Sequence, residues 1–202
     1  MRIDLTSHDG WGLSWVAAEP AFMQRGSHAV RDADGGVWLF DPVDGDGLAD
    51  ALAGLGEVRG VVQLVDRHPR DCAALAERHG VPLYAVPVNG VPGLAGEPVV
   101  LHDRRWWREV AFWLPERRAL LVGESVGTAP YFLAPGDRVG LHPFARIGPP
   151  TALTGRSPDH LLPGHGEAVS GDFLGEELDA VIRRGRRDLP RAWVGAARSW
   201  RR

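Results

Sequence analysis

Polar residues that could bind a metal ion or an anion stand directly after three apolar segments of this sequence. The β-branched segment 58–65 is followed by Asp66-Arg67-His68-Pro69-Arg70-Asp71. Glu124 follows the apolar segment 119–123, and His165 follows segment 160–163 in the stretch Pro163-Gly164-His165-Gly166. Because α/β folds place ligand sites at the carboxyl ends of their strands, we expect these three groups to converge.

The acidic and imidazole side chains among them suit a metal ion. Mixed carboxylate and imidazole sets bind Zn, Mn or Fe, and a bound metal lowers the pKa of a coordinated water enough to create a nucleophile near neutral pH. The candidate ligands are Asp66, His68, Asp71, Glu124 and His165. In the alternative, Asp66 and Asp71 accept hydrogen bonds from backbone amides or pair with neighbouring arginines, and no metal is bound.

Arg67 and Arg70 lie between the candidate ligands. A guanidinium group holds a carboxylate or phosphate through two parallel hydrogen bonds, so both residues are candidates for binding a small acidic substrate. The alternative is an internal ion pair with Asp66 or Asp71. Since a cation beside a divalent metal is repelled unless carboxylates screen it, Arg70 limits the expected site to one metal ion at most.

The elements that position these residues alternate between strands and helices in the first half of the chain. Residue patterns predict strands at 12–18, 27–30, 37–40, 58–65 and 81–86, with helices at 47–55 and 70–79. Strand, helix, strand order gives parallel pairing through a right-handed crossover. The second half is predicted to have strands at 99–102, 109–114, 119–123 and 160–163, a loop-rich stretch at 127–155 and an amphipathic helix at 172–184.

Length and composition indicate one folded domain. The chain has 202 residues, of which 44% are hydrophobic and 24% charged, unlike the charge-rich composition of disordered proteins. We expect a single domain over residues 1–189, followed by an arginine-rich tail over 190–202. Such a tail could bind nucleic acid, but the chain has a formal net charge of -3, so we expect a solvated extension and no nucleic-acid partner.

Cysteine content and hydropathy indicate a cytoplasmic protein. Cys72 is the only cysteine, which excludes an intramolecular disulfide and a CxxC motif. The sequence begins without the apolar run of a signal peptide and has no apolar segment of about 20 residues that could span a membrane. We therefore expect a cytoplasmic location and no membrane contact.

Three motifs together resemble the metallo-β-lactamase-like hydrolase superfamily. They are the strand and acidic turn Val37-Trp38-Leu39-Phe40-Asp41-Pro42, the stretch Leu120-Leu121-Val122-Gly123-Glu124, and Leu161-Leu162-Pro163-Gly164-His165-Gly166. In that superfamily the last two motifs carry an aspartate that bridges two metals and a histidine of the second metal site. The resemblance runs from about residue 27 to 169. It implies an α/β/β/α sandwich of two mixed β-sheets with helices outside.

The superfamily's metal-binding motif is only partly present. Its His-x-His-x-Asp-His pattern falls on Asp66 to Asp71, where only His68 matches. Arg70 replaces the aspartate that binds metal, Glu124 replaces the bridging aspartate, and a further family histidine falls near Arg105, with His102 close by. The resemblance implies an atypical hydrolase that uses at most one Zn, Mn or Fe ion on an ester, thioester or phosphoester. The alternative is an inactive domain of the same fold that binds a small anion or a protein partner.

Aromatic residues between the first and second motifs offer an apolar surface. Trp106, Trp107 and Trp113, with Phe112, could line an apolar substrate pocket. Aromatic side chains of this kind also serve as core or loop anchors. The sequence leaves both interpretations open.

Overall fold

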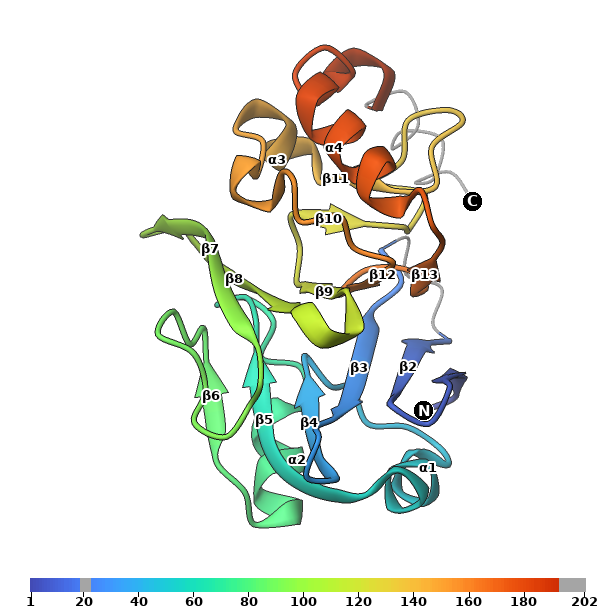
Figure 1. Cartoon of the computed structure of the whole chain (residues 1–202), viewed down its shortest axis with the longest axis vertical. Helices are drawn as coiled ribbons and strands as arrows, with labels where there is room; N and C mark the ends of the chain where they lie inside the picture. Colours follow the sequence, from blue (N-terminus) through green and yellow to red (C-terminus); the bar gives the residue numbers. More distant parts are fainter. Residues whose placement is uncertain (19–22, 193–202) are drawn as a thin grey trace.

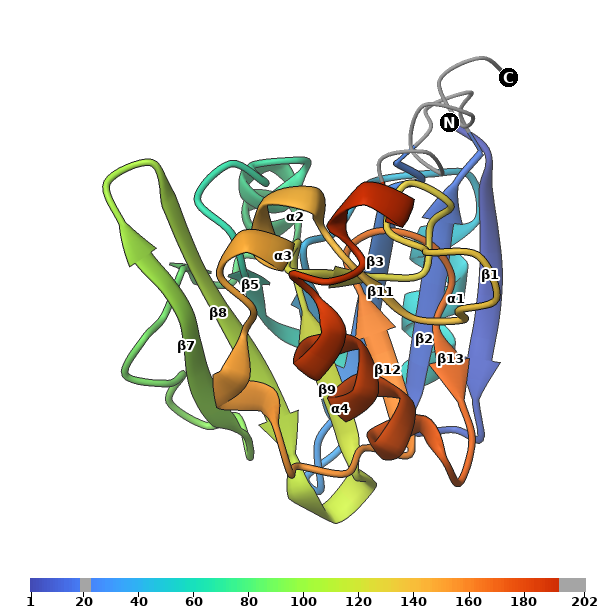
Figure 2. The ribbon, with the colours of Figure 1, turned by 90° about the horizontal axis from the view of Figure 1, so that it is seen from above.

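The computed structural model describes residues 1–18 and 23–192, which form two β-sheets packed face to face with helices on both outer sides (Figure 1). The first sheet has the order β1-β2-β3-β4-β5-β6 and the second the order β13-β12-β9-β8-β7. Helices α1 (Leu48–Leu55) and α2 (Cys72–His79) cover the first sheet, and α3 (Pro143–Ile147) and α4 (Leu174–Arg184) cover the second (Figures 1 and 2). The predicted α/β/β/α sandwich with two mixed sheets is confirmed.

The first sheet changes from antiparallel to parallel pairing at β4. Its strands are β1 (Ile3–His8), β2 (Gly12–Ala17), β3 (Gly26–Arg31), β4 (Gly36–Phe40), β5 (Glu57–Gln63) and β6 (Leu83–Ala85). The β3–β4 turn is a hairpin in which Asp32 Oδ1 accepts hydrogen bonds from the backbone of Asp34 and Gly36. β4, β5 and β6 pair in parallel through α1 and α2, as the strand, helix, strand order predicts.

The second sheet places two strand ends side by side. Its strands are β7 (Glu97–Arg104), β8 (Trp107–Leu114), β9 (Ala119–Val122), β12 (His160–Pro163) and β13 (Val169–Ser170). β8 and β9 are antiparallel across the short helical turn Pro115–Arg117, whereas β9 and β12 are parallel. The segments that follow β9 and β12 therefore emerge at one edge of the sheet.

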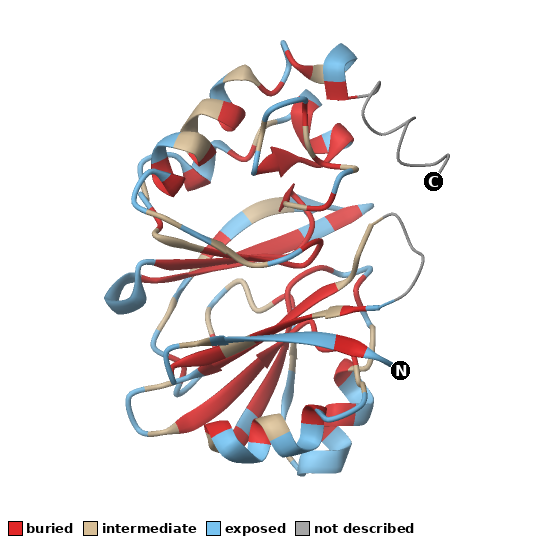
Figure 3. Ribbon diagram, turned by 90° about the vertical axis from the view of Figure 1, so that its right-hand side faces the viewer, coloured by how far each residue is buried: buried red, intermediate tan, exposed pale blue. Residues whose placement is uncertain are grey.

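Apolar side chains form one core between the sheets and a second under α1 and α2. The larger core includes Phe40, Phe112 and Leu121, and the smaller one includes Leu39, Leu52 and Leu75. Phe112 and Trp113 are buried at 0% and 9% exposure, so both belong to the core and do not line a surface pocket. Burial is concentrated on the strands, and exposure on the outer sides of the helices (Figure 3).

Two stretches differ from the sequence prediction. Strand β1 was not predicted because its alternation of apolar and polar residues covers only Ile3 to Thr6 and is followed by two polar residues. It is an edge strand that pairs only with β2. The stretch predicted to be loop-rich contains the hairpin β10 (Val126–Gly127) with β11 (Gly140–Leu141) and helix α3. Most of the predicted arginine-rich tail, residues 193–202, lies outside the described residues.

None of the helices within residues 1–18 and 23–192 combines the length and the apolar character needed to cross a membrane.

Candidate metal centre

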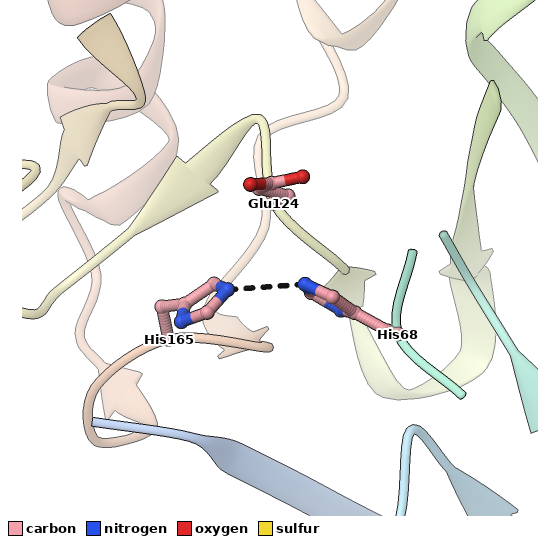
Figure 4. Close-up of side chains that lie close together, drawn as sticks. All are labelled: His68, Glu124 and His165. Carbon is pink, nitrogen blue, oxygen red and sulfur yellow. Dashed lines mark hydrogen bonds between the residues drawn. The ribbon is translucent and has the colours of Figure 1, made fainter. Parts of the chain in front are cut away.

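His68, Glu124 and His165 meet at the edge where β5, β9 and β12 end (Figure 4). One ligand atom from each residue lies within 4.8 Å of the others, and all three residues are buried. Each residue comes from one of the three groups that the sequence places after an apolar segment. The two histidines are 97 residues apart in sequence. The structure thus brings one residue of each group together at this edge.

The hydrogen bonds of the two imidazoles fix where their protons lie. His68 Nδ1 is 3.0 Å from Asp41 Oδ2, and His165 Nδ1 is 3.0 Å from the carbonyl oxygen of Met23. A carbonyl and a carboxylate accept hydrogen bonds, so this network assigns a proton to each Nδ1. In the neutral rings, each Nε2 therefore carries an unshared electron pair.

The two Nε2 atoms lie 3.2 Å apart (Figure 4). Burial lowers the pKa of both His68 and His165, so both rings are neutral at ordinary pH. The two atoms are within hydrogen-bond distance, so either a proton or a metal ion between them would stabilise the pair. Two imidazole nitrogens bound to one tetrahedral zinc ion at ~2.0–2.1 Å are about 3.3 Å apart, so the pair fits a shared metal ion.

Glu124 adds a buried carboxyl group held in place by Glu109. The Oε1 atom of Glu109 accepts hydrogen bonds from the backbone amides of Glu124 and Ser125 at 2.8 and 2.9 Å. Burial raises the pKa of Glu124 to about 7, although the positive charge of Arg67 opposes this shift. Its Oε2 receives no hydrogen bond of good geometry from the described residues, although the guanidinium group of Arg67 lies beside it.

Arg67 and His142 complete the surroundings of Glu124. Arg67 Nε forms an ion pair with Glu124 Oε2 at 2.9 Å, while its guanidinium group stacks 4.6 Å above the Trp107 ring. Burial lowers the pKa of His142 to about 4. Its Nδ1 accepts a hydrogen bond from the Phe144 amide, which places the proton of the neutral ring on Nε2, 3.7 Å from Glu124 Oε1. His142 is thus a donor beside the cluster.

Arg70 binds backbone carbonyls from three segments. Its guanidinium group donates hydrogen bonds to the carbonyl oxygens of Gly26, Asp41 and Gly164, at 2.8 Å for Asp41 and 2.6 Å for Gly164. These carbonyls belong to the start of β3, the turn after β4 and the loop after β12, so Arg70 connects the two sheets beneath the cluster. It pairs with neither Asp66 nor Asp71.

Asp66 and Asp71 lie outside the cluster. Asp66 is exposed and its Oδ2 accepts a hydrogen bond from the Arg108 amide at 3.2 Å. Asp71 Oδ2 accepts one from the Asp44 amide at 2.8 Å. The structure therefore brings together three of the five predicted ligands, and the other two bind backbone amides.

Glycine allows the close approach that brings His165 to the cluster. A Cβ atom on Gly164 would lie 2.1 Å from the carbonyl oxygen of Gly123, which follows β9. Gly166 has a φ of +91°, and a Cβ atom there would lie 2.3 Å from the Ala129 amide nitrogen. Both glycines are thus required by the packing of the His165 loop against the segments that follow β9 and β10.

Three residues of this site were not predicted from the sequence. Asp41 orients His68, Glu109 positions the Glu124 backbone, and His142 faces the Glu124 carboxyl group. Two of them had a readable signal: Glu109 begins the predicted strand 109–114, whose other residues are apolar, and Asp41 directly follows a fully buried strand. His142 had no such signal, because a residue directly before a proline is common where a helix begins.

Solved structures give independent evidence on the fold. No protein-family model and no curated protein matches the sequence. The structure resembles that of the metallo-β-lactamase DIM-1 exposed to ceftazidime, with a TM-score of 0.57 at 13% identity over 91% of this chain and 97% of that one. It also resembles the mono-zinc form of FIM-1 from Pseudomonas aeruginosa, with a TM-score of 0.55 at 13% identity over 91% of this chain and 96% of that one. A metallo-β-lactamase from Erythrobacter litoralis matches with a TM-score of 0.56 at 10% identity over 90% of this chain and 92% of that one.

Proposed function

Because this chain is a divergent member of the metallo-β-lactamase fold, we propose that it binds one divalent metal ion through His68, Glu124 and His165 and hydrolyses an ester, thioester or phosphoester. The observation that carries the proposal is the pair of Nε2 atoms 3.2 Å apart, each on a ring whose Nδ1 donates to an acceptor, so that a shared metal ion would stabilise both. Zinc fits their spacing, and Mn or Fe suit the same donor set.

The residues around the cluster prepare it for a metal. Asp41 and the Met23 carbonyl keep both Nε2 atoms unprotonated, which is the form that binds metal. Glu109 holds the Glu124 backbone, so the carboxyl group stays at the cluster. A bound metal ion supplies a Lewis acid and a coordinated water of lowered pKa.

Arg67 and His142 are the proposed contacts for substrate. The Arg67 side chain is 39% exposed, so its guanidinium group can bind a negatively charged group of the substrate while its Nε stays near Glu124. His142 carries its proton on Nε2 and can donate a hydrogen bond to a substrate oxygen. Arg70, the other predicted substrate residue, has three of its hydrogen bonds committed to backbone carbonyls, so we assign it to positioning the cluster.

One metal ion is the proposed limit. The second site of the superfamily would use an aspartate at the place of Arg70 and a histidine at that of Asp71. The guanidinium group of Arg70 is buried, where its positive charge opposes a second cation.

Elemental analysis with a hydrolysis screen tests the proposal. Protein purified without chelator should contain up to one equivalent of Zn, Mn or Fe, and His68→Ala and His165→Ala should each lower that content. Wild type should then hydrolyse at least one of three chromogenic probes, a p-nitrophenyl ester, a thioester or bis(p-nitrophenyl) phosphate, and lose this activity with chelator. His79→Ala, a change at an exposed histidine of α2, is the matched control.

The alternative is an inactive domain that binds a small anion or a protein partner at the same place. The ion pair of Arg67 with Glu124 favours it, because this pair already balances the carboxylate charge without a metal. Wild-type protein that stays metal-free in excess Zn and Mn would reject the hydrolase proposal in favour of this one.

A further inference from the structure

A groove of about 820 Å³ lies between the tip of the β7–β8 hairpin and α3, which face each other in Figure 1. Three large apolar side chains line it and are exposed to solvent: Trp106 at 63%, Phe144 at 55% and Ile147 at 58%. Exposed apolar side chains gathered on one concave surface are typical of a ligand site. The groove is thus a candidate binding surface outside the metal cluster.

Two aromatic contacts connect the lining of the groove to residues beside the cluster. Trp107 lines the groove, and the guanidinium group of Arg67 stacks on its ring. Phe144 lies on the opposite wall, with its ring 5.6 Å from that of His142. Since Arg67 and His142 both face Glu124, a ligand in the groove could place one end beside the cluster.

The charges along the groove favour an anion. Arg104 and Arg186 are exposed and line it from the hairpin and from the segment after α4. The acidic residue in the lining, Asp103, forms an ion pair with Arg108 at 3.5 Å, which reduces its effect. His102 also lines the groove, with its ring packed 4.1 Å from that of Trp107, and its buried Nε2 has no hydrogen-bond partner among the described residues.

We infer that this groove binds the apolar, preferably aromatic, part of a small organic anion. The inference rests on the proposed function for its link to hydrolysis, since it identifies the groove as the substrate surface of that site. Trp106 and Phe144 would cover the two faces of a flat ring, and Arg104 would bind a negative group at the outer end. Arg67 then binds the acidic end nearest the reacting bond.

Binding of anilinonaphthalene sulfonate, a flat aromatic anion, tests the groove without any need for metal or turnover. Isothermal calorimetry on chelator-treated full-length protein should give one site. Trp106→Ala and Phe144→Ala should each weaken sulfonate binding about tenfold or more, because each removes a large apolar contact. Arg104→Gln should weaken binding of the sulfonate anion and leave the affinity for neutral anilinonaphthalene unchanged. Phe173→Ala, which removes an aromatic side chain that is 68% exposed and outside this lining, should change nothing.

Equal affinity in wild type and the two aromatic variants would overturn the inference, as would equal loss in Phe173→Ala. Neutral anilinonaphthalene binding as tightly as the sulfonate would overturn its anionic part. His68→Ala separates this inference from the proposed function, since it removes metal and should leave groove binding intact. Groove binding without any metal in wild type would support the anion site and reject its role in hydrolysis.

Discussion

Replacing Arg70 with methionine removes the connection between the two sheets beneath the cluster. The guanidinium group donates to three carbonyls, on Gly26, Asp41 and Gly164, and Arg70→Met leaves all three without this donor. The Asp41 carbonyl still accepts a hydrogen bond from the Ser27 hydroxyl group, and the Gly164 carbonyl still accepts one from the Gly26 amide, so these two are not left unsatisfied. Hydrogen bonds to a charged group contribute about 1.5–3 kcal/mol each, and the variant no longer buries a charge, so we expect a net loss on the order of 2–4 kcal/mol. That loss lowers the melting temperature by about 5–10 °C in a domain of this size.

Backbone conformation adds a reason to expect a large effect. Asp41 and Arg70 both have positive φ, 43° and 40°, which neither residue adopts readily. Such strain persists only where surrounding contacts enforce it, and the Arg70 hydrogen bond to the Asp41 carbonyl is one of these contacts. The variant should therefore also lower metal affinity, because Asp41 orients His68.

Urea unfolding at neutral pH measures the free energy of unfolding for wild type, Arg70→Met and Arg70→Lys. Lysine keeps the charge but lacks the planar fork of donors, so we expect an intermediate loss. Arg78→Met is the control, because Arg78 is exposed and its ion-pair partner among the described residues is Asp44. Its free energy of unfolding should equal that of wild type within error. Arg70→Met as stable as Arg78→Met would refute the assignment of Arg70 as a connection between the sheets.

Three further predictions concern the same region. Burial lowers the pKa of His28 to about 3, so the unfolded state takes up this residue's proton first as the pH falls. Urea unfolding should therefore show that the free energy of unfolding falls by about 2 kcal/mol between pH 7 and 5 because of His28, and this contribution should be absent in His28→Asn. In Asp41→Asn, the amide N–H₂ group can face His68 Nδ1, which would move the ring proton to Nε2. Zinc affinity, measured by chelator competition, should then fall about 10–100-fold, and an unchanged affinity would contradict the assigned tautomer. Gly164→Ala places a Cβ atom 2.1 Å from the Gly123 carbonyl, so thermal unfolding should show severe destabilisation, and a wild-type melting temperature would contradict the close packing.

The sequence predicted the fold because most of its elements have strong local signals. Strand β4 is a run of apolar residues, the buried part of β5 is rich in valine, and Gly80 ends α2 in a left-handed conformation, as its position after the helix predicts. Strand β1 had only a short alternation of apolar and polar residues, and its pairing with β2 determines it. The local residue pattern was thus enough to predict the central strands, whereas the edge strand β1 depends on its pairing with β2.

The site was predictable only where residue type and strand end coincide. His68, Glu124 and His165 each follow a strand and were found in this way. Asp66 and Asp71 share that context, yet nearby backbone amides are their partners, which only the path of the chain determines. The same holds for Arg70, whose carbonyl partners lie up to 94 residues away in sequence.

The most direct test of the metal site is X-ray absorption spectroscopy at the zinc edge on protein loaded with one equivalent of zinc. We predict two imidazole nitrogens at ~2.0–2.1 Å with a carboxylate oxygen in the same shell. His68→Ala and His165→Ala should each remove one imidazole from that shell. A spectrum without imidazole scattering, or one that both variants leave unchanged, would contradict a metal site at His68, Glu124 and His165.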